Sequence, residues 1–346
     1  MKLLLFDPLR RSQRFCAQRL FTNNSVNLAY DVTAAQFDPS SRPVLILHGL
    51  FGHKGNWRST ASALQRKLSN RVYTADLRNH GDSPHRPSMT LKEMAKDVIS
   101  LIRRLDLGAT EFSLIGHSLG GRVATLVALQ EPAIVQRLLL VDISPRQMNQ
   151  PDQIITVALD ALKKCPLRGD YSEVRRNAFK DLMKTLNNKE VTEFLLTSLN
   201  AKKGEPPAWK FNIEAIDSHM SDILRLDIEP GSSFAKPTCI IRGEKSSYVR
   251  DEDLPLCNRF FPHLEVHTVE NVGHWVHSEN PASLRSGEWC IKFDQRACRW
   301  FELVMQTGRA KFTTENDYTV SVSVPESHYI FRICDSLNFL TDVPTT

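Results

Sequence analysis

A single serine, Ser118, stands between Gly116 and Gly120 in the segment SLIGHSLGGRV, residues 113–123. Glycine and serine are common in turns, so the pattern alone could be a plain glycine-rich turn. Its neighbours favour another interpretation, because an apolar strand-like run ends at Ile115 and a helix-like segment begins just after the serine. Strand, sharp turn and helix in that order form an elbow that exposes a nucleophilic serine, and small neighbours let strand and helix approach. The pattern therefore predicts Ser118 as a nucleophile.

A serine hydroxyl needs a base to remove its proton, and His274 is the predicted base. The sequence has 11 histidines, but only this one follows directly after the last strand-like run, in NVGHWVH. In chains with a serine at such an elbow, the histidine comes last in the sequence. We expect His267 inside the preceding strand, His277 on a following helix, and His117 beside the serine with its ring turned away.

Acyl transfer by a serine also requires two N–H donors for the oxyanion of the tetrahedral intermediate. We predict the backbone amide of Leu119, directly after the nucleophile, as one donor. The second should come from the loop HGLFG, as the backbone amide of Leu50 or Phe51. In this interpretation the donor is the backbone of Leu50 or Phe51 and not its side chain, and His48 and Gly49 let the backbone turn tightly toward the site.

Strand-like and helix-like segments alternate on both sides of these residues. Short apolar runs such as residues 44–47 are typical of buried strands, and residues 91–105 have apolar side chains at helical spacing. The alternation predicts βαβ units, and hence a mostly parallel sheet flanked by helices over residues 23–145 and 235–284. Between them, residues 146–234 lack strand patterns and carry several apolar sets at helical spacing. This segment is predicted to be a helical cap inserted into the α/β domain.

The two ends of the chain differ from the rest. Residues 1–22 are rich in arginine and nearly free of acidic residues, with neither a long apolar core nor a small-residue cleavage pattern. That composition is typical of a mitochondrial transit peptide rather than a secretory signal, and it predicts mitochondrial import. A disordered basic tail is the alternative. Residues 285–346 lose the helical periodicity and form an atypical C-terminal tail, for which the sequence predicts no structure.

Charge and cysteine usage narrow the classes of function. Four of the five net positive charges fall in residues 1–30, so the remainder gives no sign of the basic face expected of a nucleic-acid-binding protein. No run of about 18 apolar residues occurs, which argues against a membrane span. The seven cysteines are an odd number at wide spacings without a CxxC pair. We therefore expect free thiols in a reducing compartment and no metal site.

The motifs HGLFG, DLRNHGDS, GHSLGG and NVGHWVH occur in the order found in α/β-hydrolases, which the chain resembles over about residues 25–284. Within that family it resembles the group of α/β-hydrolase domain-containing protein 11 and its bacterial and yeast esterase relatives. The resemblance implies an α/β-hydrolase fold, with carboxylic ester or acylglycerol substrates in the mitochondrial matrix. It also implies an association with the mitochondrial 2-oxoacid dehydrogenase machinery.

The acid that orients the histidine is the member of the triad that the sequence fixes least. Many relatives carry it after the strand that follows the cap, and that position falls near Ser246, which cannot serve. The narrower group carries it at the carboxyl end of the preceding strand, which corresponds to Asp142 in LLLVDISP. Asp142 could instead cap the chain as it enters the helical insertion. Glu214 and Asp251 are then the alternative acids.

Together these residues predict a serine hydrolase that cleaves carboxylic esters through an acyl-enzyme, with Ser118, His274 and Asp142 as triad and no metal or organic cofactor. The cap would form a lid, and its apolar faces with Leu50 and Phe51 predict an acyl-chain pocket. Two alternatives remain open. An alcohol acyltransferase would use the same residues with an alcohol in place of water. A non-catalytic protein would keep the fold to bind a ligand or partner.

Overall fold

The computed structural model describes residues 25–33, 41–105, 111–200 and 205–279, together with the backbone of three strands within residues 311–332. The chain divides into two compact units, Met1–Arg285 and Ser286–Thr346. The predicted targeting segment, residues 1–22, lies outside the described residues.

The first unit is built on one sheet of seven strands, in the spatial order β1-β3-β2-β4-β5-β8-β9. β1 pairs antiparallel with β3, and every other neighbouring pair is parallel. β2 has the sequence VLIL and β5 ends in LLLV, and both runs are buried, as a parallel sheet covered by helices requires. The predicted mostly parallel sheet is confirmed. Its strands are β1 (Tyr30–Thr33), β2 (Val44–Leu47), β3 (Val72–Ala75), β4 (Phe112–His117), β5 (Val135–Val141), β8 (Thr238–Gly243) and β9 (Leu264–Val269).

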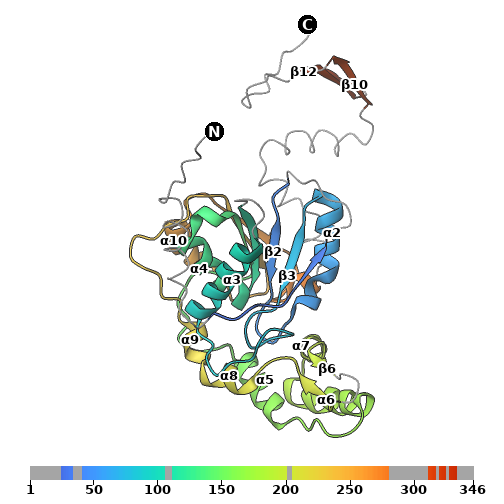
Figure 1. Cartoon of the computed structure of the whole chain (residues 1–346), viewed down its shortest axis with the longest axis vertical. Helices are drawn as coiled ribbons and strands as arrows, with labels where there is room; N and C mark the ends of the chain where they lie inside the picture. The colour runs from blue at the N-terminus through green and yellow to red at the C-terminus, as the bar shows by residue number, and fades with distance from the viewer. Residues whose placement is uncertain are drawn as a thin grey trace, which may run out of the picture. The chain divides into compact units, whose positions relative to one another are not determined.

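Helices cover this sheet. α3 and α4 lie side by side over its middle strands, whereas α2 lies against β3 (Figure 1). α3 begins with a capping box, in which Thr90 and Glu93 exchange hydrogen bonds at the first turn. The helices and short 3-10 turns of this part are η2 (Lys54–Trp57), α2 (Arg58–Leu68), α3 (Leu91–Leu105), α4 (Leu119–Gln130), η3 (Pro132–Ile134), η4 (Asp251–Asp253), α10 (Leu254–Phe260) and α11 (Val276–Glu279).

The helical cap between β5 and β8 is confirmed, and its helices lie together beside the core (Figure 1). Four of them begin at side-chain caps provided by Asp152, Asp170, Asn188 and Asn212. One detail differs from the prediction that this segment has no strands, because two very short strands pair within it. The cap elements are α5 (Gln153–Lys164), α6 (Tyr171–Leu186), α7 (Lys189–Leu196), β6 (Leu199–Asn200), β7 (Ala208–Trp209), α8 (Ile213–Ser218) and α9 (Met220–Leu224).

The second unit contains three antiparallel strands, β10 (Lys311–Asn316), β11 (Thr319–Val324) and β12 (Ser327–Arg332), in that spatial order. The sequence analysis left this segment without a structure. Alternation in TVSVSV, the sequence of β11, is the signal that could have indicated a strand.

In the part of the chain that the structure describes, no helix has the length and apolar character needed to cross a membrane. The same residues include no cluster of three or more His, Cys, Asp or Glu side chains that could hold a metal ion.

Candidate active site

Ser118 occupies the turn between β4 and α4 in a strained backbone conformation. Its φ of 50° and ψ of −116° lie outside the regions that residues with a side chain favour. The flanking glycines make the turn possible: a Cβ on Gly116 would lie 2.4 Å from the carbonyl oxygen of Gly120, and one on Gly120 would lie 2.5 Å from that of Leu47. The predicted strand–turn–helix elbow is therefore present, and its glycines are needed for close approach.

Asp142 directly follows β5 and lies against His274. Its side chain is fully buried, and its Oδ2 is 2.6 Å from Nδ1 of His274. The carboxylate also accepts hydrogen bonds from the amide of Gly243, at 3.0 Å, and from the hydroxyl of Ser246. A carboxylate at Nδ1 fixes the imidazole tautomer and leaves Nε2 available as a base.

The two alternative acids lie elsewhere. Glu214 is exposed in the first turn of α8. Asp251 is also exposed, and it forms an ion pair with Arg242 at 2.7 Å. Of the three candidates that the sequence left open, Asp142 is the one that contacts His274.

Aromatic rings surround His274. The ring of Tyr248 stacks on its imidazole with centroids 3.8 Å apart and an angle of 18° between the planes. On another side, Nε2 of His117 donates a hydrogen bond to the carbonyl oxygen of His274, at 3.0 Å. The rings of His117 and His277 lie 4.6 Å apart, and His277 stacks on Trp57. Burial lowers the pKa of His277 to about 3 and that of His117 well below its usual value, so both are neutral.

Ser118 and His274 belong to the same edge of the sheet. Both follow the carboxyl ends of parallel strands, as does Asp142, and open α/β sheets bind ligands at that edge. Tyr248 connects them, because it stacks on His274 and also lines a cavity with Ser118. The opposite arrangement, with serine and histidine on different faces of the molecule, does not occur.

The structure distinguishes the two candidates for the second oxyanion donor. The amide of Phe51 already donates to Nε2 of His80, at 3.3 Å. The amide of Leu50 has no such acceptor within the described residues, and Leu50 lines the cavity with Ser118 and Leu119. Leu119 is the first residue of α4, where an amide has no acceptor within the helix. Within the described residues, Leu119 and Leu50 are therefore the candidates whose amides have no protein acceptor.

The side chain of His48 also supports the oxyanion loop. Its Nδ1 donates to the carbonyl oxygen of Gly49 at 2.8 Å, and its Nε2 accepts from the amide of Leu77 at 3.0 Å. Burial lowers its pKa to about 3, which keeps the ring neutral and able to do both. Gly49 is needed for close approach, since a Cβ there would lie 2.7 Å from Nδ1 of His117.

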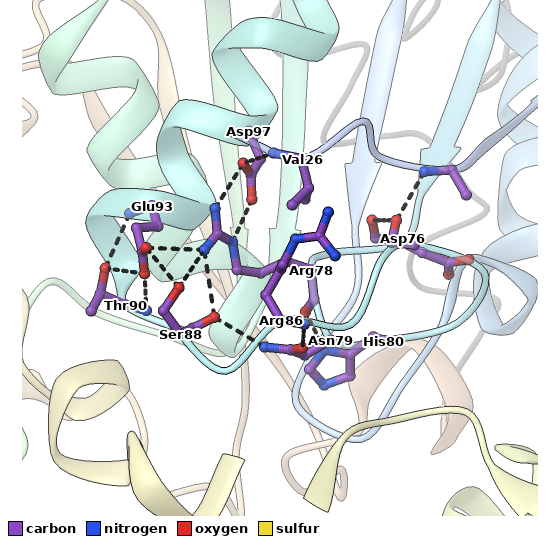
Figure 2. A network of polar contacts seen from close by, with 12 residues as sticks. Val26, Asp76, Arg78, Asn79, His80, Arg86, Ser88, Thr90, Glu93 and Asp97 are labelled. Atoms are coloured by element: carbon purple, nitrogen blue, oxygen red, sulfur yellow. Dashed lines mark hydrogen bonds and ion pairs between the residues drawn. The ribbon is translucent and has the colours of Figure 1, made fainter. Parts of the chain in front are cut away.

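Residues of the segment DLRNHGDS form a network of polar contacts next to this loop (Figure 2). Arg78 donates to both carboxylate oxygens of Asp97, at 2.6 and 3.0 Å, and forms an ion pair with Glu93. Asp97 also accepts from the amide of Val26 at 2.8 Å, which ties the first described segment to α3. These contacts fix the chain immediately before His80, whose ring reaches the oxyanion loop.

A small cavity lined by Ser118 and a larger hollow share part of their lining. The first, about 40 Å³, is mostly apolar and includes Leu50 from the core and Ile155, Met220 and Ile223 from the cap. The second is an open hollow of about 400 Å³ with a polar lining. The spaces share the lining residues Met148, Pro151, Asp152 and Tyr248.

Phe51 is not among the residues that line these spaces. It is buried and packs on Phe211 of the cap, with ring centroids 5.2 Å apart. The cavity therefore contains Leu50 but not Phe51, in contrast to the prediction for the acyl pocket.

Residues 42–281 match the family model described as the alpha/beta hydrolase fold. The chain belongs to the α/β-hydrolase family. This α/β-hydrolase is 36% identical, over 273 residues, to the protein named sn-1-specific diacylglycerol lipase ABHD11 of Danio rerio, covering 78% of this chain and 84% of that relative. It is 26% identical over 293 residues to ethanol acetyltransferase 1 of Eremothecium cymbalariae, covering 76% of this chain and 80% of that relative.

Among solved structures, this α/β-hydrolase is similar to one titled marine microorganism esterase. The TM-score is 0.69 at 29% sequence identity, and the match covers 76% of this chain and 98% of that chain. The lipase and esterase relatives support a hydrolase.

Several residues that complete the site were missed by sequence reasoning. Ser246 was set aside because a serine cannot be the acid, yet its hydroxyl holds Asp142. Its position after β8, where many relatives carry the acid, was the available signal. No sequence pattern pointed to Tyr248 or to the ring of His80.

Proposed function

We propose that this α/β-hydrolase cleaves carboxylic esters through an acyl-enzyme on Ser118. The observation that carries the proposal is the 2.6 Å contact between Asp142 and Nδ1 of His274, at the sheet edge where Ser118 occupies a strained elbow. A strained backbone conformation such as that of Ser118 persists only when the surrounding structure holds it, and such conformations cluster at active sites. The lipase and esterase relatives support the same class of reaction.

The reaction proceeds in two acyl-transfer steps. Nε2 of His274 takes the proton of Ser118 as its Oγ attacks the ester carbonyl carbon, and the carbonyl oxygen becomes an oxyanion. The amides of Leu119 and Leu50 stabilise that oxyanion. When the intermediate collapses, the C–O bond to the alcohol breaks, and the alkoxide takes the proton from His274.

Hydrolysis of the acyl-enzyme repeats this sequence with water. His274 takes a proton from the water as its oxygen attacks the acyl carbon, and the proton then returns to Oγ of Ser118 as the carboxylic acid leaves. Throughout, Asp142 holds the proton on Nδ1 of His274 and stabilises the imidazolium.

The small cavity lined by Ser118 and the larger hollow that shares part of its lining suit the two halves of an ester. The small apolar space, closed by Ile155 and Met220 of the cap, accepts a short acyl chain. The larger polar hollow, which includes Asn149 and Gln150, accepts a hydrophilic alcohol such as the glycerol of an acylglycerol. A lipid-type ester with a short acyl group is therefore the substrate that we propose, in keeping with the lipase relative.

The test combines probe labelling with an ester panel. Wild-type protein is expected to react with a fluorophosphonate probe and Ser118→Ala is not. On p-nitrophenyl esters, kcat/KM should fall as the acyl chain lengthens, and Ile155→Ala should extend the accepted length. Folded wild-type protein that neither labels nor turns over any ester would instead support a non-catalytic binding protein.

An alcohol acyltransferase is the second candidate, favoured by the relative named ethanol acetyltransferase 1. The same residues would act, with an alcohol rather than water attacking the acyl-enzyme. Adding ethanol to the ester assay and analysing the products distinguishes the two reactions. Ethyl ester in place of free acid identifies the transferase.

We also propose that residues 1–22 direct the protein to mitochondria, on the strength of their arginine-rich, acid-poor composition. A fluorescent fusion of residues 1–30 should enter mitochondria, and a cytosolic signal would refute this. The association with 2-oxoacid dehydrogenase complexes, implied by the family resemblance, is tested by co-purification from mitochondria.

A further inference from the structure

The oxyanion loop HGLFG is held at successive peptide groups. The carbonyl oxygen of Gly49 accepts from Nδ1 of His48 at 2.8 Å and from the amide of Gly52 at 3.1 Å. The next peptide donates its N–H, that of Phe51, to His80. In a trans peptide the C=O and N–H point in opposite directions. Fixing the Gly49 carbonyl therefore also fixes the direction of the Leu50 amide, the proposed oxyanion donor.

The following peptide is held from the cap. Ser198, two residues after α7, donates its hydroxyl to the carbonyl oxygen of Phe51 at 2.7 Å, and its side chain is fully buried. The backbone of Phe51 is thus hydrogen-bonded at both polar groups, to the core through its N–H and to the cap through its C=O.

These two hydrogen bonds hold a residue whose backbone is strained. Its φ is 63°, in the left-handed region that residues other than glycine rarely adopt. Such a conformation persists only where several contacts determine it. Its ring also packs on Phe211 of the cap, so two cap residues act on one strained residue of the loop.

A second contact between cap and loop lies beside the first. Nε2 of His53 donates to the carbonyl oxygen of Thr197 at 3.0 Å. The side-chain amide of Asn56 donates to Oγ1 of Thr197 at 2.8 Å. Both residues belong to the turn that follows the oxyanion loop, so the cap and this turn are joined over residues 197–198.

We infer that Ser198 of the cap is a positioning residue for the oxyanion donor Leu50, so that docking of the cap on the core and assembly of the oxyanion hole are one event. The inference rests on the proposed function. It assigns the cap a role in the chemical step in addition to covering the substrate.

The test compares Ser198→Ala with a matched control, Thr192→Val. Thr192 is an equally buried hydroxyl on α7 that donates to the carbonyl oxygen of Asn188, within the cap. Loss of one oxyanion donor lowers kcat by about 10²–10³-fold. Displacing the donor is expected to lower kcat of Ser198→Ala by about tenfold or more, with KM within about twofold of wild type. Thr192→Val should retain wild-type kcat at a similar melting temperature.

A second variant covers the case in which Ser198→Ala does not fold. Thr197→Val removes the hydroxyl that accepts from Asn56 on a more exposed residue, and a smaller fall in kcat is expected. In a double-mutant cycle, the fall in kcat of the double variant His80→Leu/Ser198→Ala should be smaller than the product of the two single falls, because both residues act on Phe51.

Equal kcat values for Ser198→Ala, Thr197→Val and wild type would overturn the inference. If wild type is active and Ser118→Ala inactive, that result leaves the proposed function intact. An inactive wild type, by contrast, would reject the proposed function itself.

Discussion

At the scale of single residues, Asp142 combines a strained backbone with a buried carboxylate that is fully hydrogen-bonded. Asp142 has a φ of 51° and is fully buried, and its carboxylate accepts from Gly243, Ser246 and His274. Burying a carboxylate is costly unless hydrogen bonds compensate it. Three donors, two of them from the turn after β8, therefore hold the carboxylate of Asp142 where it can orient the imidazole.

Replacing this acid by its amide tests that role. In Asp142→Asn the side chain keeps its size but no longer holds the proton on Nδ1, and we expect kcat to fall by about 10³–10⁴-fold. The measurement is kcat for ester turnover, and an unchanged melting temperature shows that the variant is folded. Asp251→Asn is the matched control and should match wild type, since Asp251 is exposed and contacts Arg242. Undiminished turnover in Asp142→Asn would contradict the assignment.

At the scale of elements, one arginine of α4 joins the core to the cap. Arg122 is buried, and it donates to the carbonyl oxygens of Ile223, at 3.1 Å, and Leu224 at the end of α9. A third bond, also 3.1 Å, reaches the carbonyl of Arg146. Burial lowers its pKa to about 10, so the cation persists at neutral pH. A positive charge at a helix carboxyl terminus satisfies carbonyls that lack intrahelical partners.

Arg122→Met removes these bonds while retaining a long apolar side chain. We expect it to lower the free energy of unfolding by about 3 kcal/mol, because three buried or half-buried carbonyl groups lose a charged donor. Chemical denaturation measures this. Arg225→Met serves as the control, since Arg225 is exposed and forms a surface pair with Asp227 that contributes less than about 1 kcal/mol. Equal stabilities of the two variants would show that Arg122 does not hold the cap.

At the scale of the whole molecule, buried histidines make stability depend on pH. Burial lowers the pKa values of His48, His80 and His277 to about 3. In the unfolded chain a histidine has a pKa of about 6.5. Between these two values the unfolded state binds more protons than the folded state. The stability that depends on these neutral histidines is therefore fully present above about pH 6.5, and it is lost as the pH falls toward 3.

Each such histidine changes the free energy of unfolding by up to about 1.4 kcal/mol per pH unit in this window. We expect the melting temperature to be at least about 5 °C lower at pH 5 than at pH 7.5. His277→Phe, which keeps a ring to stack on Trp57, should reduce that pH dependence. Identical melting temperatures at the two pH values would refute the explanation.

The sequence by itself determined the sheet, the cap and the elbow, because these depend on local patterns. Apolar runs specify buried strands, helical spacing specifies the cap, and the glycines around Ser118 permit the sharp turn. It also identified His274, through its place after the last strand of the sheet.

Only the tertiary structure decided which acid meets His274, that the amide of Phe51 in the oxyanion loop donates to His80, and that Ser198 holds that loop. Asp142 and His274 are separated by 132 positions in the chain, and Ser198 and Phe51 by 147. Local sequence patterns carry no record of such contacts. They arise when parallel strands bring their carboxyl ends to one edge of the sheet and the cap packs beside it.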